Sequence, residues 1–181
     1  PRGNTPKEDE RLKDLLRKSE KDRRENVMIV DMVRNDLSAH ATKGSVNVSD
    51  LYTIETYPRV HQMHSTVTAE IKQGSRLLDA LVAAFPMASM TGAPKIRAME
   101  IIENLEVTKR GLFSGTIGFF TPEKNADFNV IIRSLIYNEN RGHLSCHVGG
   151  GITDLSNPEA EYEECLTKVS PILDLVNALH H

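Results

Sequence analysis

The sequence lacks a long hydrophobic run, a surplus of basic residues and a spaced set of cysteines. No apolar stretch reaches the roughly 18 residues that a membrane-spanning helix needs, and no signal-peptide pattern is visible. The net charge of -3 argues against a nucleic-acid partner, because phosphate-binding domains usually carry a basic surplus. The two cysteines, Cys146 and Cys165, are typical of reduced thiols. We therefore expect a cytoplasmic protein that binds neither membranes nor nucleic acids.

The chain has 181 residues, of which 39% are hydrophobic, and this is enough to bury the core of one domain. It begins at Pro1 and not at a methionine, which indicates a piece of a longer protein. His180 and His181 are interpreted as the remnant of an expression tag. We expect residues 1–179 to be the C-terminal portion of a single domain.

Hydrophobic periodicity predicts a mixture of helices and strands. A charged segment with a helical stripe of leucines opens the chain, with Thr5 as its candidate N-cap. Groups of strands separated from pairs of helices indicate an α+β fold with antiparallel sheets and flanking helices. The expected helices cover residues 6–37, 77–85, 94–105 and 158–179, and the expected strands cover residues 46–57, 60–71, 112–120, 128–137 and 143–148.

Two pairs of carboxylates stand near opposite ends of the chain. Asp22 and Glu25 form one pair, and Glu161 and Glu164 form the other. Each pair has i, i+3 spacing, so on a helix both side chains leave the same face, and Lys168 follows one turn after the second pair. Together the two faces could bind a hard divalent cation through oxygen ligands. Taken alone, each pair is more typical of a solvated helix face.

Five short motifs occur in order along the chain: VDMVRNDL at residues 30–37, SMTGAPK at 89–95, RAME at 97–100, GGGI at 149–152 and EAEYEE at 159–164. Together they closely resemble the chorismate-utilising enzymes. This family includes the large subunits of anthranilate synthase and aminodeoxychorismate synthase and, at greater distance, isochorismate and salicylate synthases. The resemblance covers residues 1–176 and implies the C-terminal part of the chorismate-binding, anthranilate synthase-like fold.

The resemblance implies a Mg²⁺ site between the two acidic helices, where the ion holds the ring carboxylate of chorismate. Glu25 and Glu164 match the direct ligands, while Asp22 and Glu161 match an outer pair that reaches the metal through water. Mg²⁺ dehydrates reluctantly, so a site with few direct carboxylates, several waters and a substrate oxygen is chemically reasonable.

The resemblance also implies residues that contact chorismate. Arg133, which we expect on a strand, matches the residue that grips the enolpyruvyl carboxylate, although an internal ion pair would explain it equally well. Ser89 matches a hydroxyl that contacts the substrate before a helix N-terminus, where simple capping is the alternative. The other implied contacts are Phe113 as an apolar wall, Gly149, Gly150 and Gly151 as closely approaching backbone, and Lys168 as a positive charge. Without the family, the glycines are typical of a turn or bulge and the lysine of a solvated helix.

Three features favour the aminodeoxychorismate branch of the family over the anthranilate branch. Residues 66–69 (Thr-Val-Thr-Ala) follow the first pattern, and so does the middle glycine, Gly150, where anthranilate synthases have alanine. Gln62 stands where anthranilate and salicylate synthases place a histidine that is associated with pyruvate elimination. An amide has no proton to give near pH 7. We do not expect His61 or His64 to replace it, because we expect both on the opposite face of the strand.

The family's nucleophilic lysine, which is an alanine in anthranilate synthases, and its general-acid glutamate would both lie upstream of Pro1. We therefore assign no catalytic residue within the chain and expect the chain alone to be inactive. The implied reaction is a transaminase-type, glutamine-dependent amination of chorismate to 4-amino-4-deoxychorismate for para-aminobenzoate and folate, with ammonia from a glutamine amidotransferase subunit. The alternatives are anthranilate synthase component I and, from another class, a non-catalytic chorismate-binding module.

Overall fold

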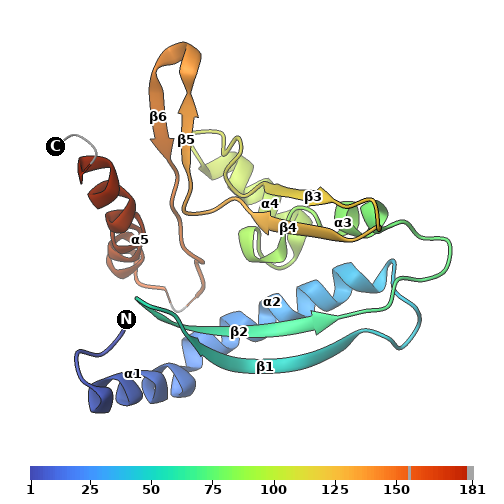
Figure 1. Cartoon of the computed structure of the whole chain (residues 1–181), viewed down its shortest axis with the longest axis horizontal. Coiled ribbons are helices and arrows are strands. Elements are labelled where there is room, and N and C mark those ends of the chain that lie inside the picture. Colours follow the sequence, from blue (N-terminus) through green and yellow to red (C-terminus); the bar gives the residue numbers. More distant parts are fainter. Residues whose placement is uncertain (155, 179–181) are drawn as a thin grey trace. The chain divides into compact units, whose positions relative to one another are not determined.

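A computed structural model describes residues 1–154 and 156–178 of the chain (Figure 1). The chain divides into two compact units, unit 1 from Pro1 to Ile102 and unit 2 from Glu103 to His181. Each unit combines helices with two-stranded antiparallel pairing, which confirms the expected α+β class. The expected tag remnant at the C-terminus lies outside the described residues.

Unit 1 opens with two helices, α1 (Pro6–Lys18) and α2 (Glu20–Ser38), where the sequence predicts a single helix. The break falls at Ser19, whose backbone is extended and whose Oγ accepts a hydrogen bond from a backbone N–H in the first turn of α2. Ser19 is therefore the N-cap of a second helix. The predicted cap at Thr5 is confirmed, because its Oγ1 accepts a hydrogen bond from the first turn of α1.

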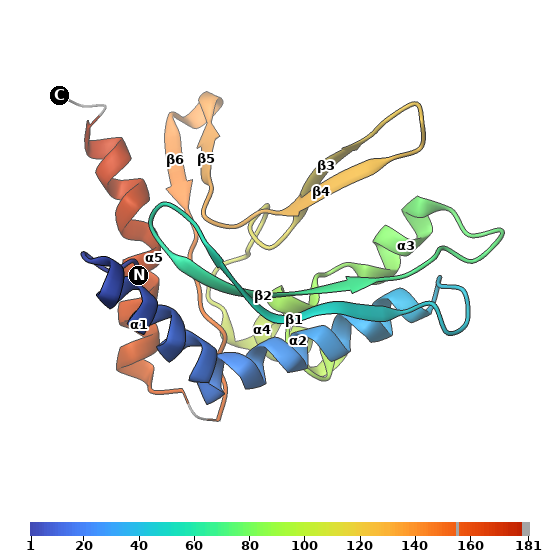
Figure 2. The same cartoon turned by 60° about the horizontal axis from the view of Figure 1, so that its bottom comes forward.

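A β-hairpin formed by β1 (Asn47–Thr56) and β2 (His61–Thr68) packs against α2 (Figures 1 and 2). Both strands were predicted, but β1 carries two bulges that the sequence pattern does not reveal. One is at Ser49, and the other includes Tyr52, which has a φ of 59° and lies opposite Ser65. The backbone N–H of Tyr52 donates a hydrogen bond to Ser65 Oγ over 3.1 Å, so a side chain replaces a ladder bond at the bulge.

The outer end of the hairpin pairs regularly, with Thr53–Thr56 opposite His61–His64. Residues two apart on a regular strand share a face, so Gln62 and His64 lie on one face and His61 lies on the other. The expectation that both histidines lie opposite Gln62 is therefore right for His61 and wrong for His64. The side chain of His61 is 2% exposed, whereas that of His64 is 34% exposed.

Helix α3 (Leu77–Ala84) of unit 1 and helix α4 (Lys95–Leu105), which begins in unit 1 and ends in unit 2, lie close to the predicted positions, with the short 3-10 helix η1 (Ala88–Met90) between them. Both α3 and η1 pack against α2. Val30 on α2 and Ala88 in η1 are the most deeply buried apolar side chains of the described residues, at 6% and 5% exposure. The core of unit 1 therefore lies along α2.

No single helix among residues 1–154 and 156–178 is long and apolar enough to cross a membrane. Residues Leu77–Met90 and α4 together have the length and composition of a membrane span, but they are bent by 58° relative to each other.

Unit 2 contains two β-hairpins followed by a long helix, where the sequence predicts three strands before the helix. Figure 2 shows each hairpin as a pair of antiparallel strands. The elements are β3 (Thr116–Phe120) paired with β4 (Ala126–Val130), β5 (Leu135–Asn138) paired with β6 (His143–Cys146), the 3-10 helix η2 (Glu139–Arg141) and α5 (Pro158–Ala178).

The single strand predicted over residues 128–137 is wrong, because the chain bends between β4 and β5. Arg133 lies at this bend with a φ of 49°, in the left-handed region that side chains with a Cβ seldom adopt. The bend separates the two strands, so β4 pairs back with β3 and β5 pairs forward with β6.

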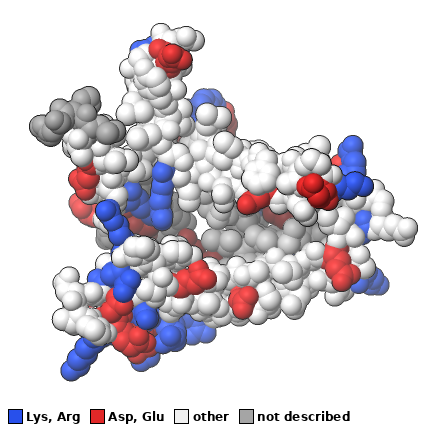
Figure 3. All heavy atoms as spheres, viewed as in Figure 1, with Lys and Arg blue, Asp and Glu red and all other residues white. Residues whose placement is uncertain are grey.

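Charged side chains of opposite sign alternate along the helices of unit 1. Arg24 contacts Glu20 at 3.3 Å and Arg34 contacts Asp31 at 2.8 Å, and all four side chains are exposed. Exposed pairs of this kind contribute little to stability. On the face drawn in Figure 3, lysines and arginines are interspersed with aspartates and glutamates.

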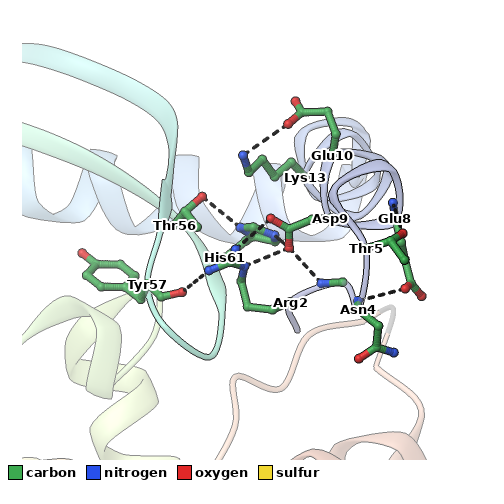
Figure 4. Close-up of polar contacts among 11 residues, drawn as sticks. Arg2, Asn4, Thr5, Glu8, Asp9, Glu10, Lys13, Thr56, Tyr57 and His61 are labelled. Atoms are coloured by element: carbon green, nitrogen blue, oxygen red, sulfur yellow. Dashed lines mark hydrogen bonds and ion pairs between the residues drawn. The ribbon is translucent and has the colours of Figure 1, made fainter.

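A polar network attaches the start of the chain to the hairpin (Figure 4). Arg2 binds Asp9 with two hydrogen bonds of 2.8 and 3.0 Å, and the backbone N–H of Gly3 donates to the same carboxylate over 2.8 Å. His61 Nε2 lies 2.9 Å from Asp9 Oδ1, and its Nδ1 lies 3.1 Å from the hydroxyl of Thr56. The hydrogen bonds from Arg2 and Gly3 hold the pKa of Asp9 well below its ordinary value.

We expect Asp9→Asn to destabilise the protein at pH 7, because the amide carries no negative charge and keeps only one acceptor oxygen for the two hydrogen bonds from Arg2. The folded-state pKa of Asp9 is depressed, so its contribution is complete above the ordinary aspartate pKa and is lost as the pH falls toward the folded-state value. The difference in urea midpoint between the wild type and the variant should therefore shrink below about pH 4. Glu10→Gln, on the exposed side of α1, is the control. A difference that stays constant down to pH 3 would contradict this role of Asp9.

Candidate functional site

The first acidic pair lies on α2 as the sequence predicts. Asp22 and Glu25 are both partly buried in the first two turns of this helix, which begins at its N-cap, Ser19. The i, i+3 spacing therefore does put both carboxylates on one helix face. Between them in sequence, the guanidinium of Arg23 lies 4.7 Å from the ring centre of Tyr52, which ties this end of α2 to the bulge of β1.

The second acidic pair lies in the first two turns of α5, also as predicted. Glu161 is only 6% exposed, and Ser156 donates a hydrogen bond of 2.7 Å to its Oε1. Glu164 is more exposed, at 43% of its side chain, and forms an ion pair of 2.6 Å with Lys168. One carboxylate of the pair is thus fixed by burial, and the other remains accessible to a ligand.

The glycine run lies directly against this acidic face of α5. A Cβ added to Gly150 would lie 3.0 Å from Glu161 Oε2 and 3.9 Å from both Glu164 Oε1 and Lys168 Nζ. Lys168 also donates a hydrogen bond of 2.9 Å to the carbonyl of Gly149. The glycines therefore allow the backbone to approach the acidic pair closely, and the lysine holds the turn in place.

Phe113 lies at the other side of the glycine turn. Its Cζ would be 4.0 Å from a Cβ added to Gly149, and its ring stacks on that of His147 with centroids 5.8 Å apart. The guanidinium of Arg110 lies 5.9 Å from the Phe113 ring and binds the carboxylate of Glu106, whose pKa these hydrogen bonds lower. An aromatic wall beside the glycines is thus present within unit 2.

His147 is a residue of this site that the sequence reasoning missed. Its Nδ1 is buried and makes no hydrogen bond to any described residue. The sequence offered one signal for it, its place two residues before Gly149. Its stacking on Phe113 joins distant segments and could not be read from the sequence.

The remaining candidates are not drawn into this cluster by any described contact. Arg133 was expected on an apolar strand that would demand a partner for its charge, but it is exposed at the bend and makes no hydrogen bond or ion pair with another described residue. Gly151 is exposed at the end of the glycine run, and Ser89 is exposed within η1. Thr91 Oγ1 donates to two backbone carbonyl oxygens of the loop before α4, so its proton is used within that loop.

The donor set of the acidic residues suits a hard cation. Carboxylate oxygens are the preferred ligands of Mg²⁺, and the turn at Gly150 has no side chain to fill the space beside Glu161 and Glu164. Among residues 1–154 and 156–178, no three histidine, cysteine, aspartate or glutamate residues already form a metal cluster. The two acidic pairs belong to different units.

Comparison with known proteins decides the family. The family model described as chorismate binding enzyme matches residues 1–174. The chain belongs to this family of chorismate-binding enzymes. The matched residues include all five motifs from which the sequence predicted this family.

Three known proteins are similar to this chain over most of its length. The chain is 47% identical over 98% of its length to an aminodeoxychorismate synthase of Streptomyces griseus, and 45% identical over 96% of its length to aminodeoxychorismate synthase component 1 of Escherichia coli. The crystal structure of anthranilate synthase component I from Streptococcus pneumoniae superposes on 90% of the chain and 37% of that protein, with a TM-score of 0.76 and 32% identity. The chain spans 24% and 38% of the length of the two curated relatives.

The close approach at Gly150 gives a stability prediction with a matched control. Replacing glycine by alanine stabilises a compatible site by about 0.4–1 kcal/mol, because the unfolded chain loses freedom. Gly149→Ala should show this gain, since its added Cβ meets nothing nearer than 4.0 Å. Gly150→Ala should lose the gain or be destabilising, because its Cβ presses on the buried carboxylate of Glu161. Urea unfolding curves compare the two, and equal stability of both variants would contradict the close approach.

Proposed function

We propose that this chain is the C-terminal part of the catalytic domain of an aminodeoxychorismate synthase. The enzyme would convert chorismate and ammonia to 4-amino-4-deoxychorismate, the precursor of para-aminobenzoate and folate. The observation that carries the proposal is the high identity, over nearly the whole chain, to two proteins named aminodeoxychorismate synthase. Because the chain spans less than half of each relative, the activity is proposed for the full-length protein.

In this proposal Mg²⁺ is held by Glu25 and Glu164 directly and by Asp22 and Glu161 through water. The bound ion would neutralise the ring carboxylate of chorismate and orient it. The burial of Glu161 beneath Gly150, with its hydrogen bond from Ser156, supports an outer, orienting role for this carboxylate. The greater exposure of Glu164 supports direct ligation.

The remaining family residues would grip the two carboxylates of chorismate. The planar guanidinium of Arg133 would bind the enolpyruvyl carboxylate with two hydrogen bonds, and its exposure leaves all of its donors available. Lys168 and the backbone of Gly149–Gly151 would surround the ring carboxylate, with Phe113 as an apolar wall. Ser89 would add a hydroxyl contact.

Ammonia would come from glutamine through an amidotransferase subunit, and the assembly would act in the cytoplasm. The Escherichia coli relative is named component 1, which supports a partner component for that protein. We extend this arrangement to the full-length protein that contains this chain.

Residues 66–69, Gln62 and Gly150 support the aminodeoxychorismate branch. The glycine at position 150 has a physical explanation, since the Cβ of an alanine there would press on Glu161. The alternative, anthranilate synthase component I, gains from His64, which shares a strand face with Gln62 and is partly exposed. A histidine in this place could donate a proton near neutral pH.

A non-catalytic chorismate-binding module is the alternative from another class. It would be favoured if the full-length protein lacked both the nucleophilic lysine and the general-acid glutamate before Pro1. The sequence immediately upstream therefore discriminates it from either enzyme.

The product of the full-length protein tests the proposed function. Incubation with chorismate, Mg²⁺ and ammonium should give an aminated product that yields para-aminobenzoate only after a separate lyase is added. Neither anthranilate fluorescence nor stoichiometric pyruvate should appear, because the enolpyruvyl group stays in place. Release of both anthranilate and pyruvate would reject the proposal in favour of the anthranilate alternative.

Glu164→Gln tests the metal assignment in the full-length protein. The change removes a charged ligand and keeps the size of the side chain, so turnover should fall on the order of 100-fold or more while the far-ultraviolet circular dichroism is unchanged. Glu163→Gln is the control, because the carboxylate of Glu163 is exposed and lies outside the proposed site. Wild-type turnover by the Glu164 variant at saturating Mg²⁺ and chorismate would show that Glu164 is not a ligand.

A further inference from the structure

The loop between α3 and α4, residues 85–94, is closed at its base by one side chain. Lys95 is the first residue of α4, and its Nζ lies 3.4 Å from the carbonyl oxygen of Ala84, the last residue of α3. The two ends of the loop are thus held close together. Compact surface loops with close ends, called Ω-loops, have about 6–16 residues, and this loop falls within that range. This loop carries Ser89.

The same ammonium group connects the loop to α2. Lys95 Nζ lies 2.6 Å from Asp36 Oδ2, and the side chains of Lys95 and Asp36 are only 18% and 10% exposed. A cation at the first position of a helix is disfavoured by the helix dipole, and removing it from water adds a further cost. The negative charge of Asp36 offsets both costs, so Lys95 depends on the ion pair with Asp36 to stay at this position.

The interior of the loop is fixed and its tip is presented to solvent. Ala88 is 5% exposed, and Thr91 Oγ1 lies 3.3 Å from the carbonyl oxygens of both Met87 and Ala88. Gly92 has a φ of 155° and packs so closely on α4 that an added Cβ would lie 3.0 Å from Ala98 Cβ. Within η1, Ser89 is exposed, whereas Ala88 is buried and Met90 is half-buried.

We propose that Lys95 and Asp36 are positioning residues, whose ion pair fixes the loop of residues 85–94 on α2 and so holds Ser89 in place. Asp36 lies roughly 20 Å along α2 from Asp22, given the rise per residue of an α-helix. The ion pair therefore acts on the loop and not on the acidic pair. That the loop then presents Ser89 to chorismate rests on the proposed function.

Hydrogen exchange of the full-length protein tests the structural part without any need for activity. In Asp36→Asn and in Lys95→Met, the amides of residues 87–93 should exchange at least about tenfold faster than in the wild type, with α2 unaffected. Arg97→Met is the matched control, because its ion pair with Glu100 lies on the same helix but is exposed, and exchange should not change. Asp36→Asn keeps the shape of the side chain, so it remains informative if Lys95→Met folds poorly. Unchanged exchange of the loop in Asp36→Asn would overturn the proposal.

Kinetics test the positioning role. If Ser89 contributes binding and not chemistry, each variant should raise the KM for chorismate at least about tenfold and leave kcat within about threefold. The double variant should be no worse than either single variant, because the two residues act as one unit. Additive losses, or a fall in kcat alone, would overturn the positioning role. A wild-type protein that does not turn over chorismate would reject the proposed function, while the exchange experiment would still decide the role of the ion pair.

Discussion

A carboxylate that is almost completely buried must be satisfied by hydrogen bonds or charges, and Glu161 imposes this requirement on unit 2. Ser156 supplies one hydrogen bond, and the absence of a side chain at Gly150 leaves the space that the carboxylate occupies. Lys168 binds both Glu164 and the backbone of the glycine turn, so the acidic face and the turn form one structure. Burial of one acid thereby arranges the accessible acid, the lysine and the glycines that a chorismate site would need.

In unit 1, one helix, α2, positions several candidate residues at once. Its first turns present the other acidic pair, its middle supplies the buried Val30, and its last turns carry Asp36, which holds Lys95 at the base of the loop with Ser89. A single helix thus supports two separate groups of candidate residues. Each depends on a short-range contact, an N-cap at Ser19 for the first and an ion pair for the second.

Much of this arrangement could be predicted because its signals are local. The i, i+3 acidic pairs needed only a helix, and the glycine run needed only the general rule that glycine permits close approach. The strand predicted through Arg133 failed because a left-handed backbone at an arginine leaves no mark in hydrophobic periodicity. His64 was assigned to the wrong face although strand periodicity alone places it with Gln62. The contacts of His61 with Asp9 and of His147 with Phe113 join distant segments, so no local pattern could reveal them.

The central proposal is that acidic pairs from both units bind the same Mg²⁺. Titration of the full-length protein with Mn²⁺ in the presence of chorismate, followed by electron paramagnetic resonance, tests it most directly. The account predicts one tightly bound ion per chain, lost both in Asp22→Asn/Glu25→Gln and in Glu161→Gln/Glu164→Gln. Unchanged affinity for that ion in either double variant would contradict the claim.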